Sequence, residues 1–195
     1  MRIGITGSPG VGKHTVAYAL SSKLKMSVLD INEVALSSAV IGMDEYSYIV
    51  DTDRLKHILN IDDDTVVVGH LLPYVLDYED LDIVIVLRRS PYELSSIYNS
   101  RGYDDVKSKD NLASEILGII AYDTFKQFKD KVVEFDTTGK DIDTVIEEIL
   151  KVVNGEEEGT FGHIDWLALV VSNNDLSRFF DYTHTADQYT DRLEA

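Results

Sequence analysis

The chain has 195 residues and a mass of 21.9 kDa, enough for one domain with a full hydrophobic core and a small appendage. With 44% hydrophobic and 27% charged residues, its composition excludes wholesale disorder and fibrous repeats. The formal net charge of −17 argues against a general nucleic-acid surface, and the lack of cysteine excludes disulfides and thiol chemistry. No apolar run reaches the roughly 18–20 residues that span a bilayer, and residues 1–6 are too short for a secretory signal, so we expect a soluble cytoplasmic protein.

Short β-branched runs alternate with helical periodicity through residues 1–153. Strands are predicted at 3–6, 26–29, 65–68, 83–87 and 131–135. Helices are predicted over 13–24, 30–40, 53–59, 91–100, 111–128 and 141–153, with a polar, turn-like stretch at 101–110. The third and fourth strands are almost wholly apolar, as in strands buried on both faces of a parallel sheet. This order predicts a three-layer α/β fold with a five-stranded parallel sheet and helices on both faces.

A change of composition follows residue 153. Residues 154–160 are rich in glycine and glutamate and predict a linker, which divides the chain into a domain at 1–153 and a segment at 154–195. Apolar residues from Ile164 to Leu176 predict a helix around Trp166, and this helix could dock on the core or on a second copy of the chain. The polar end, 183–195, is predicted to be loosely ordered.

A glycine-rich loop stands between the first predicted strand and the first predicted helix. It matches G-x-x-x-x-G-K and consists of Gly7, Ser8, Pro9, Gly10, Val11, Gly12 and Lys13. Glycines allow backbone N–H groups to turn inward around an anion, and the lysine reaches the β- and γ-phosphates. We therefore predict ATP binding here, in preference to an ordinary turn with a solvated lysine.

The residue after Lys13 departs from this motif. A Ser or Thr hydroxyl normally binds Mg²⁺ at that position, and here it is His14. Imidazole is a poor ligand for Mg²⁺, and Thr15 is rotated by about 100° around the helix, so it is no simple substitute. We interpret His14 as a solvent-facing residue in preference to a metal ligand, and we include both His14 and Thr15 among the candidate nucleotide-binding residues.

A second motif begins at the end of the helix predicted over 91–100. It reads R-G-Y-x-x-x-K-x-x-D-N-x-x-x-E and comprises Arg101, Gly102, Tyr103, Lys107, Asp110, Asn111 and Glu115. In this motif and in the glycine-rich loop, the chain resembles the atypical adenylate kinases of archaea and eukaryotic nuclei. Two shorter pieces also fit that family, one at 44–46 with 51–54 and one at 66–70, and the resemblance covers roughly residues 1–153.

The resemblance implies a nucleotide-kinase-like P-loop fold with a short lid at about 99–110. It implies the reaction of ATP with AMP to give two ADP, with Mg²⁺ as cofactor, an additional ATPase activity and a role in assembly of the small ribosomal subunit through a small-subunit ribosomal protein. Arg101 would be the lid cation on the transferring phosphate, which suits a reaction that depends on positioning and charge neutralisation. Without the motif, Arg101 would be interpreted as a surface arginine.

Four positions differ from the family pattern. His14 replaces the threonine that binds Mg²⁺, Val68 replaces the acid of an acid-x-His motif, and Leu36 and Ile97 stand where arginines are expected. Together they remove a metal ligand, an acid and two phosphate-binding cations. We therefore expect the kinase rate to suffer more than nucleotide binding.

Three further side chains are candidates with open alternatives. Asp30, with Glu33 nearby, could hold Mg²⁺ through water in place of the missing acid. His70 follows a buried strand. The resemblance implies that it orients water or contacts the γ-phosphate, and the alternative is an ordinary loop histidine. Thr138 either flanks the adenine ring, as the resemblance implies, or belongs to an ordinary strand-to-helix turn.

Two hypotheses about function follow. The first is an active nucleoside monophosphate kinase with His70, Lys13 and Arg101 as its catalytic residues. The second is an impaired nucleotide-binding assembly factor whose acidity suits docking to a basic ribosomal protein. A P-loop GTPase is not favoured, because no N-K-x-D tetrapeptide is present.

Overall fold

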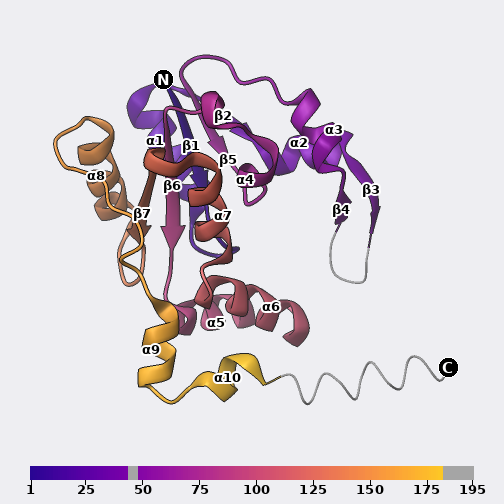
Figure 1. Ribbon diagram of the computed structural model, residues 1–195, viewed down its shortest axis with the longest axis vertical. Coiled ribbons are helices and arrows are strands. Elements are labelled where there is room, and N and C mark those ends of the chain that lie inside the picture. The colour runs from indigo at the N-terminus through magenta and orange to yellow at the C-terminus, as the bar shows by residue number, and fades with distance from the viewer. Residues whose placement is uncertain (44–47, 182–195) are drawn as a thin grey trace.

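The computed structural model describes residues 1–43 and 48–181. Its centre is a parallel sheet in the order β2-β5-β1-β6-β7 (Figure 1). The strands are β1 (Arg2–Thr6), β2 (Ser27–Asp30), β5 (Thr65–Val68), β6 (Ile83–Arg88) and β7 (Val132–Asp136). All five coincide with predicted strands, so the predicted five-stranded parallel sheet is confirmed.

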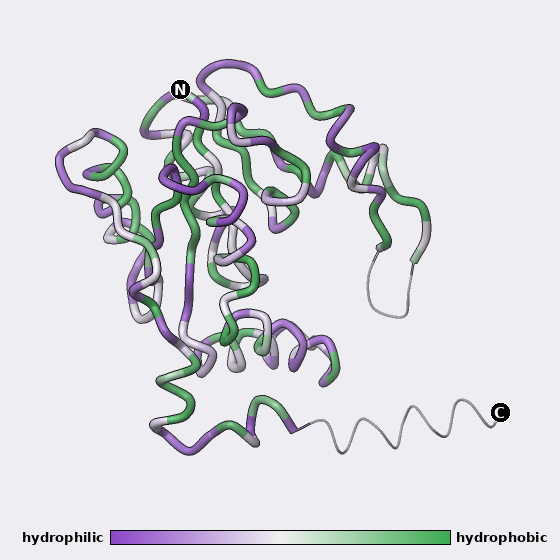
Figure 2. The backbone as a smooth tube through the Cα atoms, viewed as in Figure 1, coloured by the Kyte–Doolittle hydropathy of each residue, from purple (hydrophilic) through white to green (hydrophobic). Residues whose placement is uncertain are grey.

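The sheet is buried on both faces, which explains its continuous apolar runs. Ile3 and Ile5 of β1 belong to one core cluster, whereas Val84 and Val86 of β6 belong to the other. Figure 2 shows hydrophobic segments gathered in the strands. Gly4 leaves room for the second layer, because a Cβ there would lie 2.6 Å from Leu81 Cδ1.

Helices cover both faces of the sheet, as predicted. On one face α1 (Lys13–Leu24) contacts α8 (Ile142–Val153), and on the other α4 (Leu72–Val75) contacts α7 (Ile119–Phe128). Two 3₁₀ turns complete this second region, η1 (Tyr78–Asp80) and η2 (Lys129–Lys131). The carboxyl ends of the parallel strands lie at one edge of the sheet. Strands β2 and β5 lie on one side of central β1, and β6 and β7 lie on the other, so the loop after β1 lies at the topological switch point of the sheet.

An antiparallel hairpin lies outside the main sheet and was not predicted. It pairs β3 (Val40–Met43) with β4 (Tyr48–Val50) and connects α2 (Ile31–Ser38) to α3 (Thr52–Ile58). The predicted helix 30–40 is therefore slightly too long, since α2 ends at Ser38 and β3 begins at Val40. The family match at 44–46 lies outside the described residues.

The helical region after β6 also differs from the prediction. The predicted helix 111–128 is two helices, α6 (Asp105–Ile116) and α7, separated where Gly118 adopts a left-handed φ of 64°. The stretch 101–110 was wrongly predicted to be turn-like throughout. Because the Asp104 side chain accepts a hydrogen bond from Lys107 N and caps α6, only residues 101–104 separate α6 from α5 (Pro91–Ser100).

The C-terminal segment docks on the core of the same chain. It forms two short helices, α9 (Trp166–Ser172) and α10 (Leu176–Phe180), where a single helix was predicted. Trp166 and Phe179 join the first core cluster, and the Phe179 ring meets Tyr92 of α5 edge-on at 5.3 Å.

Upstream, the predicted linker follows the sheet edge, because Glu134 N donates to Thr160 O at 2.8 Å. The predicted tail 183–195 lies outside the described residues, and within the described ones no helix could cross a membrane.

We expect Phe179→Ala to lower the free energy of unfolding by about 3 kcal/mol, because it removes a large side chain that is 1% exposed. Denaturant unfolding measures the change. Leu176→Ala on the same helix is the matched control, since Leu176 is 44% exposed and should cost well under half as much. Equal losses in the two variants would mean that α10 is not docked as described.

Candidate functional site

The loop from β1 to α1 requires glycine at defined points. Gly7 and Gly10 have φ of 141° and 88°, and Gly12 has 97°. A Cβ on Gly7 would lie 2.3 Å from Leu87 O, so no larger residue fits there. The loop thus passes close to β6 with backbone geometry suited to surrounding an anion.

Lys13 begins α1 directly after this loop. Its side chain is 6% exposed, and its Nζ donates to Ser8 O at 3.4 Å. The pKa of Lys13 is lowered to about 8, chiefly by burial and in smaller part by the Arg101 charge, against the opposing charges of Asp30 and Glu115. Burial destabilises the charged form of Lys13, which has one long hydrogen bond, so a phosphate anion beside its Nζ would stabilise that charge.

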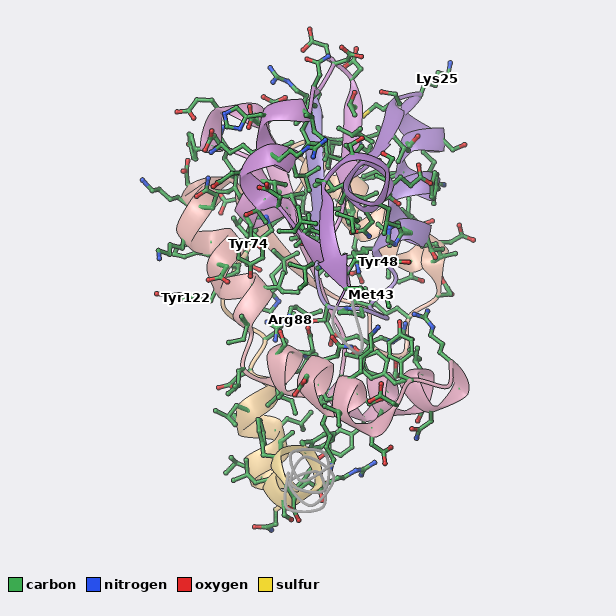
Figure 3. The ribbon with its side chains drawn as sticks, turned by 90° about the vertical axis from the view of Figure 1, so that its right-hand side faces the viewer. Lys25, Met43, Tyr48, Tyr74, Arg88 and Tyr122 are labelled. Atoms are coloured by element: carbon green, nitrogen blue, oxygen red, sulfur yellow. The ribbon has the colours of Figure 1, made fainter. Side chains whose placement is uncertain are left out.

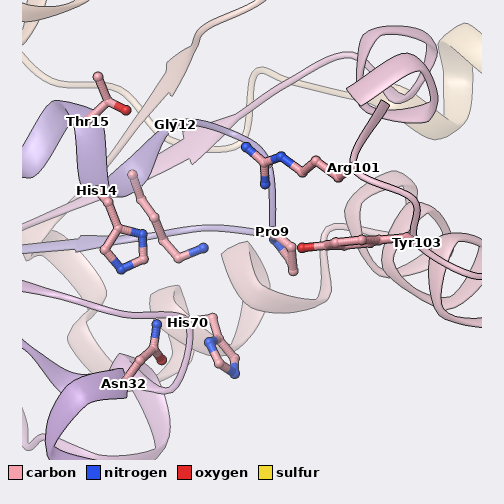
Figure 4. Close-up of a pocket in the computed structure, with 10 residues that line it drawn as sticks. Pro9, Gly12, His14, Thr15, Asn32, His70, Arg101 and Tyr103 are labelled. Carbon is pink, nitrogen blue, oxygen red and sulfur yellow. The ribbon is translucent and has the colours of Figure 1, made fainter. Parts of the chain in front are cut away.

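A cavity of about 280 Å³ opens beside the loop (Figure 4). Arg101 and Tyr103 lie on one side of it, and His14, Asn32 and His70 lie across from them. Its full lining is Pro9, Gly10, Gly12, Lys13, His14, Thr15, Asn32, His70, Arg101 and Tyr103. The site therefore brings together candidates that are up to 92 positions apart, from Pro9 to Arg101.

Several predicted residues do not line this cavity. Gly7, Ser8 and Val11 shape the loop from behind it, and the Val11 side chain is core. Thr138 Oγ1 accepts a hydrogen bond from the N–H of Ser90, the residue that caps α5, at 2.8 Å.

His14 points toward a carboxylate. Its Nε2 lies 3.0 Å from Asp30 Oδ2, and its side chain is 40% exposed. Asp30 also caps α2 by accepting a hydrogen bond from Asn32 N at 2.8 Å. Both oxygens of Asp30 are therefore engaged, and the side chain predicted to hold Mg²⁺ through water already has His14 as a partner.

The residues present fit Mg²⁺ only in company with a nucleotide. Within the described ranges, no group of three or more His, Asp or Glu side chains could hold a metal by itself. Mg²⁺ in phosphoryl-transfer sites takes most of its ligands from phosphates and water, with one or two carboxylates. Asp30 is the carboxylate next to the loop that could serve, provided that it releases His14.

His70 is largely buried and lines the cavity after β5. Burial lowers its pKa to about 4, and the charges of Lys13 and His14 act in the same direction. The ring is therefore neutral at pH 7. It can donate or accept a hydrogen bond at a water or phosphate oxygen but adds no positive charge there.

Tyr103 is anchored beneath the cavity rim. Its ring stacks on Tyr98 with centroids 5.2 Å apart and planes at 11°, and Tyr98 donates its hydroxyl to Pro9 O at 2.6 Å. The segment that carries Arg101 is thus joined to the glycine loop by an aromatic pair. The sequence motif included Tyr103 but assigned it no contact.

A buried ion network behind the loop was missed in the sequence. Arg88 donates from Nε to Glu115 Oε1 at 2.8 Å and from Nη1 to Glu134 Oε1 at 2.6 Å. Ser8 Oγ donates to Glu115 Oε2 at 2.6 Å, which fixes the loop to α6. Figure 3 shows Arg88 where the sheet meets the α5–α6 pair. Glu115 had been noted only as the last residue of the family motif.

A family model described as an AAA domain matches residues 3–118. A Thermococcus kodakarensis protein named "Putative adenylate kinase" is 32% identical over 169 residues, covering 85% of this chain and 93% of that protein. Proteins of the same name from Saccharolobus solfataricus and Methanocaldococcus jannaschii are 34% and 30% identical, covering 86% and 93% of this chain and 88% and 97% of theirs. The chain belongs to this adenylate kinase family.

Solved structures at lower identity share the fold. The shikimate kinase of Acinetobacter baumannii, in complex with shikimate, aligns with a TM-score of 0.58 at 16% identity, covering 80% of this chain and 94% of that one. YorR of Bacillus subtilis, in complex with phosphorylated GDP, aligns with 0.54 at 18% identity, covering 80% and 97%. Both agree with the predicted P-loop kinase fold.

Three departures from the predicted adenylate kinase pattern lie in different environments. Val68 is fully buried in β5, so an acid there would need buried hydrogen-bond donors to satisfy it. Ile97 of α5 packs against the first core cluster, and Leu36 of α2 is 55% exposed. The change at Ile97 therefore adds packing, whereas the change at Leu36 places an apolar side chain in solvent.

We expect Arg88→Met to lower the free energy of unfolding by about 3–5 kcal/mol, because it leaves two buried carboxylates without their cation. The matched control is Arg89→Met, whose ion pair with Glu93 at 2.7 Å is partly exposed and should be worth under about 1 kcal/mol. Urea unfolding at pH 7 compares the two. Similar small losses would mean that the network is not needed for folding.

Proposed function

We propose that this protein transfers the γ-phosphoryl group of ATP to a nucleoside monophosphate, AMP by preference. The observation that carries the proposal is Lys13, a buried cation in a glycine-lined anion loop that faces Arg101 across a cavity. Two cations from separate elements suit a phosphoryl group in transit, whose charge must be neutralised from both sides. The names of the archaeal relatives support AMP as the acceptor.

Each candidate has a role in this proposal. Lys13 holds the β- and γ-phosphates, and the N–H groups of residues 7–12 surround them. Arg101 approaches the transferring group from the segment between α5 and α6. His70, neutral at pH 7, orients water or a phosphate oxygen. Residues 1–153 are the kinase domain in this scheme, with the lid at about 99–110 formed by the short loop and the start of α6.

Mg²⁺ binding is the weakest part of the machinery. When bound, Mg²⁺ would neutralise charge between the β- and γ-phosphates. His14 supplies no hydroxyl for it, and the carboxylate of Asp30 is engaged by His14 at 3.0 Å. We propose that turnover with Mg²⁺ is slow for this reason. The valine at position 68 in place of an acid, and Leu36 and Ile97 in place of arginines, slow it further.

The alternative is an impaired nucleotide-binding protein with residual ATPase activity that acts through a basic partner, such as a small-subunit ribosomal protein. The net charge of −17 favours such a partner by complementary fields. A coupled assay of ADP formation from ATP with and without AMP separates the two. AMP-dependent ADP formation supports the kinase, and AMP-independent phosphate release without transfer supports the alternative.

We expect Lys13→Ala to weaken ATP binding by at least about tenfold and to abolish ADP formation, because charge-assisted contacts of this kind contribute roughly 1.5–3 kcal/mol. Near pH 8 about half of the empty sites hold a neutral lysine, and a bound phosphate restores the charge. ATP binding should then take up about half a proton, and affinity should fall as the pH rises above 8.

Titration calorimetry at pH 8 in buffers of different ionisation enthalpy measures affinity and proton uptake together. Lys23→Ala, at an exposed position on the same helix, is the matched control and should change neither. Undiminished ATP affinity in Lys13→Ala would remove the loop from the proposed site.

We expect His14→Thr to raise Mg²⁺-dependent ADP formation several-fold. The change restores a hydroxyl where Mg²⁺ normally finds one and releases Asp30, at a helix-propensity cost of about a few tenths of a kcal/mol. The wild type should turn over faster with Mn²⁺ than with Mg²⁺, because Mn²⁺ accepts nitrogen more readily. His57→Thr, at a remote exposed histidine, controls for loss of an imidazole. Fast wild-type turnover with Mg²⁺ and no gain in His14→Thr would show that the missing hydroxyl is irrelevant.

A further inference from the structure

One buried carboxylate connects the C-terminal segment to the phosphate loop. Glu115 Oε1 accepts a hydrogen bond from Trp166 Nε1 at 3.0 Å, and Glu115 Oε2 accepts one from Ser8 Oγ at 2.6 Å. The Glu115 side chain is 2% exposed, so water does not compete for either oxygen. Trp166, which does not line the cavity, is thus connected to the glycine loop through Glu115 alone.

The connection continues from Ser8 to the lysine. Ser8 O accepts the hydrogen bond of Lys13 Nζ at 3.4 Å and that of Val11 N at 3.5 Å. Any shift of Ser8 therefore moves the group that holds the lysine head. Because the Ser8 side chain is buried and its hydroxyl donates to Glu115, the carboxylate sets where Ser8 lies.

The same carboxylate lies at the base of the helix that follows the Arg101 segment. Glu115 is the last but one residue of α6, and α6 starts four residues after Arg101. On the outer side of α6, Lys109 Nζ donates to Asp181 O at 2.8 Å, just beyond α10. In Figure 1 α9 and α10 lie beside the α5–α6 pair, and α6 contacts both.

We propose that Trp166 is a positioning residue for the phosphate loop, acting through Glu115 and Ser8, so that α9 belongs functionally to the nucleotide site. This inference rests on the proposed ATP binding at that loop. The Trp166 N–H is one of three donors on Glu115 Oε1, beside Arg88 Nε and Arg89 N, and it is the one supplied by the C-terminal segment. Without it, the carboxylate can tilt toward its remaining donors and release Ser8.

The test compares two variants that each remove hydrogen bonding of the C-terminal segment. Trp166→Phe removes the donor to Glu115. Tyr92→Phe removes the hydroxyl that donates to Asp175 Oδ2 at 2.8 Å and accepts from Asn173 Nδ2 at 3.0 Å. It leaves the ring on Phe179, and neither lost bond involves Glu115. Titration calorimetry well below the unfolding temperature should give ATP affinity roughly threefold to tenfold weaker for Trp166→Phe and unchanged for Tyr92→Phe.

Trp166 is the only tryptophan of the chain, so its own fluorescence provides a second readout. Saturating ATP should change the emission of the wild type, because occupancy of the loop alters the Glu115 contact. In Ser8→Ala, which keeps Trp166 and breaks the path, ATP bound at saturation should leave the emission unchanged. If Trp166 only packed α9 against the core, its emission would not change with ATP in the wild type and stay constant in Ser8→Ala.

The outcomes separate the two proposals. Equal ATP affinities in Trp166→Phe and Tyr92→Phe, or an emission response that persists in Ser8→Ala, would overturn the positioning role while leaving ATP binding intact. If calorimetry finds no ATP binding to the wild type, the proposed function fails first, and the positioning role falls with it because no bound phosphate remains to be positioned.

Discussion

The Glu115 carboxylate, buried at the end of α6, is the interaction around which the nucleotide end of the molecule assembles. A carboxylate taken out of water loses several kcal/mol of hydration, so it is tolerated only if donors satisfy its oxygens. Arg88 must serve Glu115 and Glu134 at once, and one guanidinium cannot supply every bond. The remaining donors come from Ser8, Trp166 and the backbone of Arg89. Satisfying one charge thus requires the loop, two helices and the sheet edge to be in place together.

This requirement explains why the site is rigid on one side and open on the other. The glycine loop is fixed from behind by Glu115 and from the side by Tyr98, whose hydroxyl donates to Pro9 O. The cavity opens on the other side of the loop, where His14, Asn32 and His70 lie across from Arg101 and Tyr103. A phosphate-binding loop fixed from behind, with an open cavity in front of it, is an arrangement that suits phosphoryl transfer.

The sequence predicted best what is local or strongly periodic. The buried strands β1, β5 and β6 were found because parallel strands covered on both faces need uninterrupted apolar runs. Strands β3 and β4 were missed because they are short and place apolar Ile41 and Met43 at exposed positions, so the sequence lacks the apolar–polar alternation of a half-buried strand. The break at Gly118 had a visible signal, a glycine inside a helical pattern, and its φ of 64° is one that other residues rarely adopt.

Pairings between distant side chains could not be predicted in this way. Arg88 and Glu134 are 46 positions apart, and no periodicity relates them. The same holds for His14 and Asp30, whose contact follows from the placement of β2 two strands from β1. The sequence identified most of the residues that line the cavity. It did not show which of them were already bonded to each other.

The depressed pKa of Lys13 also changes what kind of reagent the empty protein is. An ammonium group is inert toward electrophiles, whereas a neutral amine attacks them, and at about 8 the pKa of Lys13 makes the neutral form abundant in mildly alkaline solution. The cavity is its path to solvent, since the side chain is otherwise enclosed. Without phosphate in the loop, the Lys13 amine is therefore a nucleophile that acylating or carbamoylating molecules can reach if they are small enough to enter the cavity. Phosphate in the loop covers the amine and protects it.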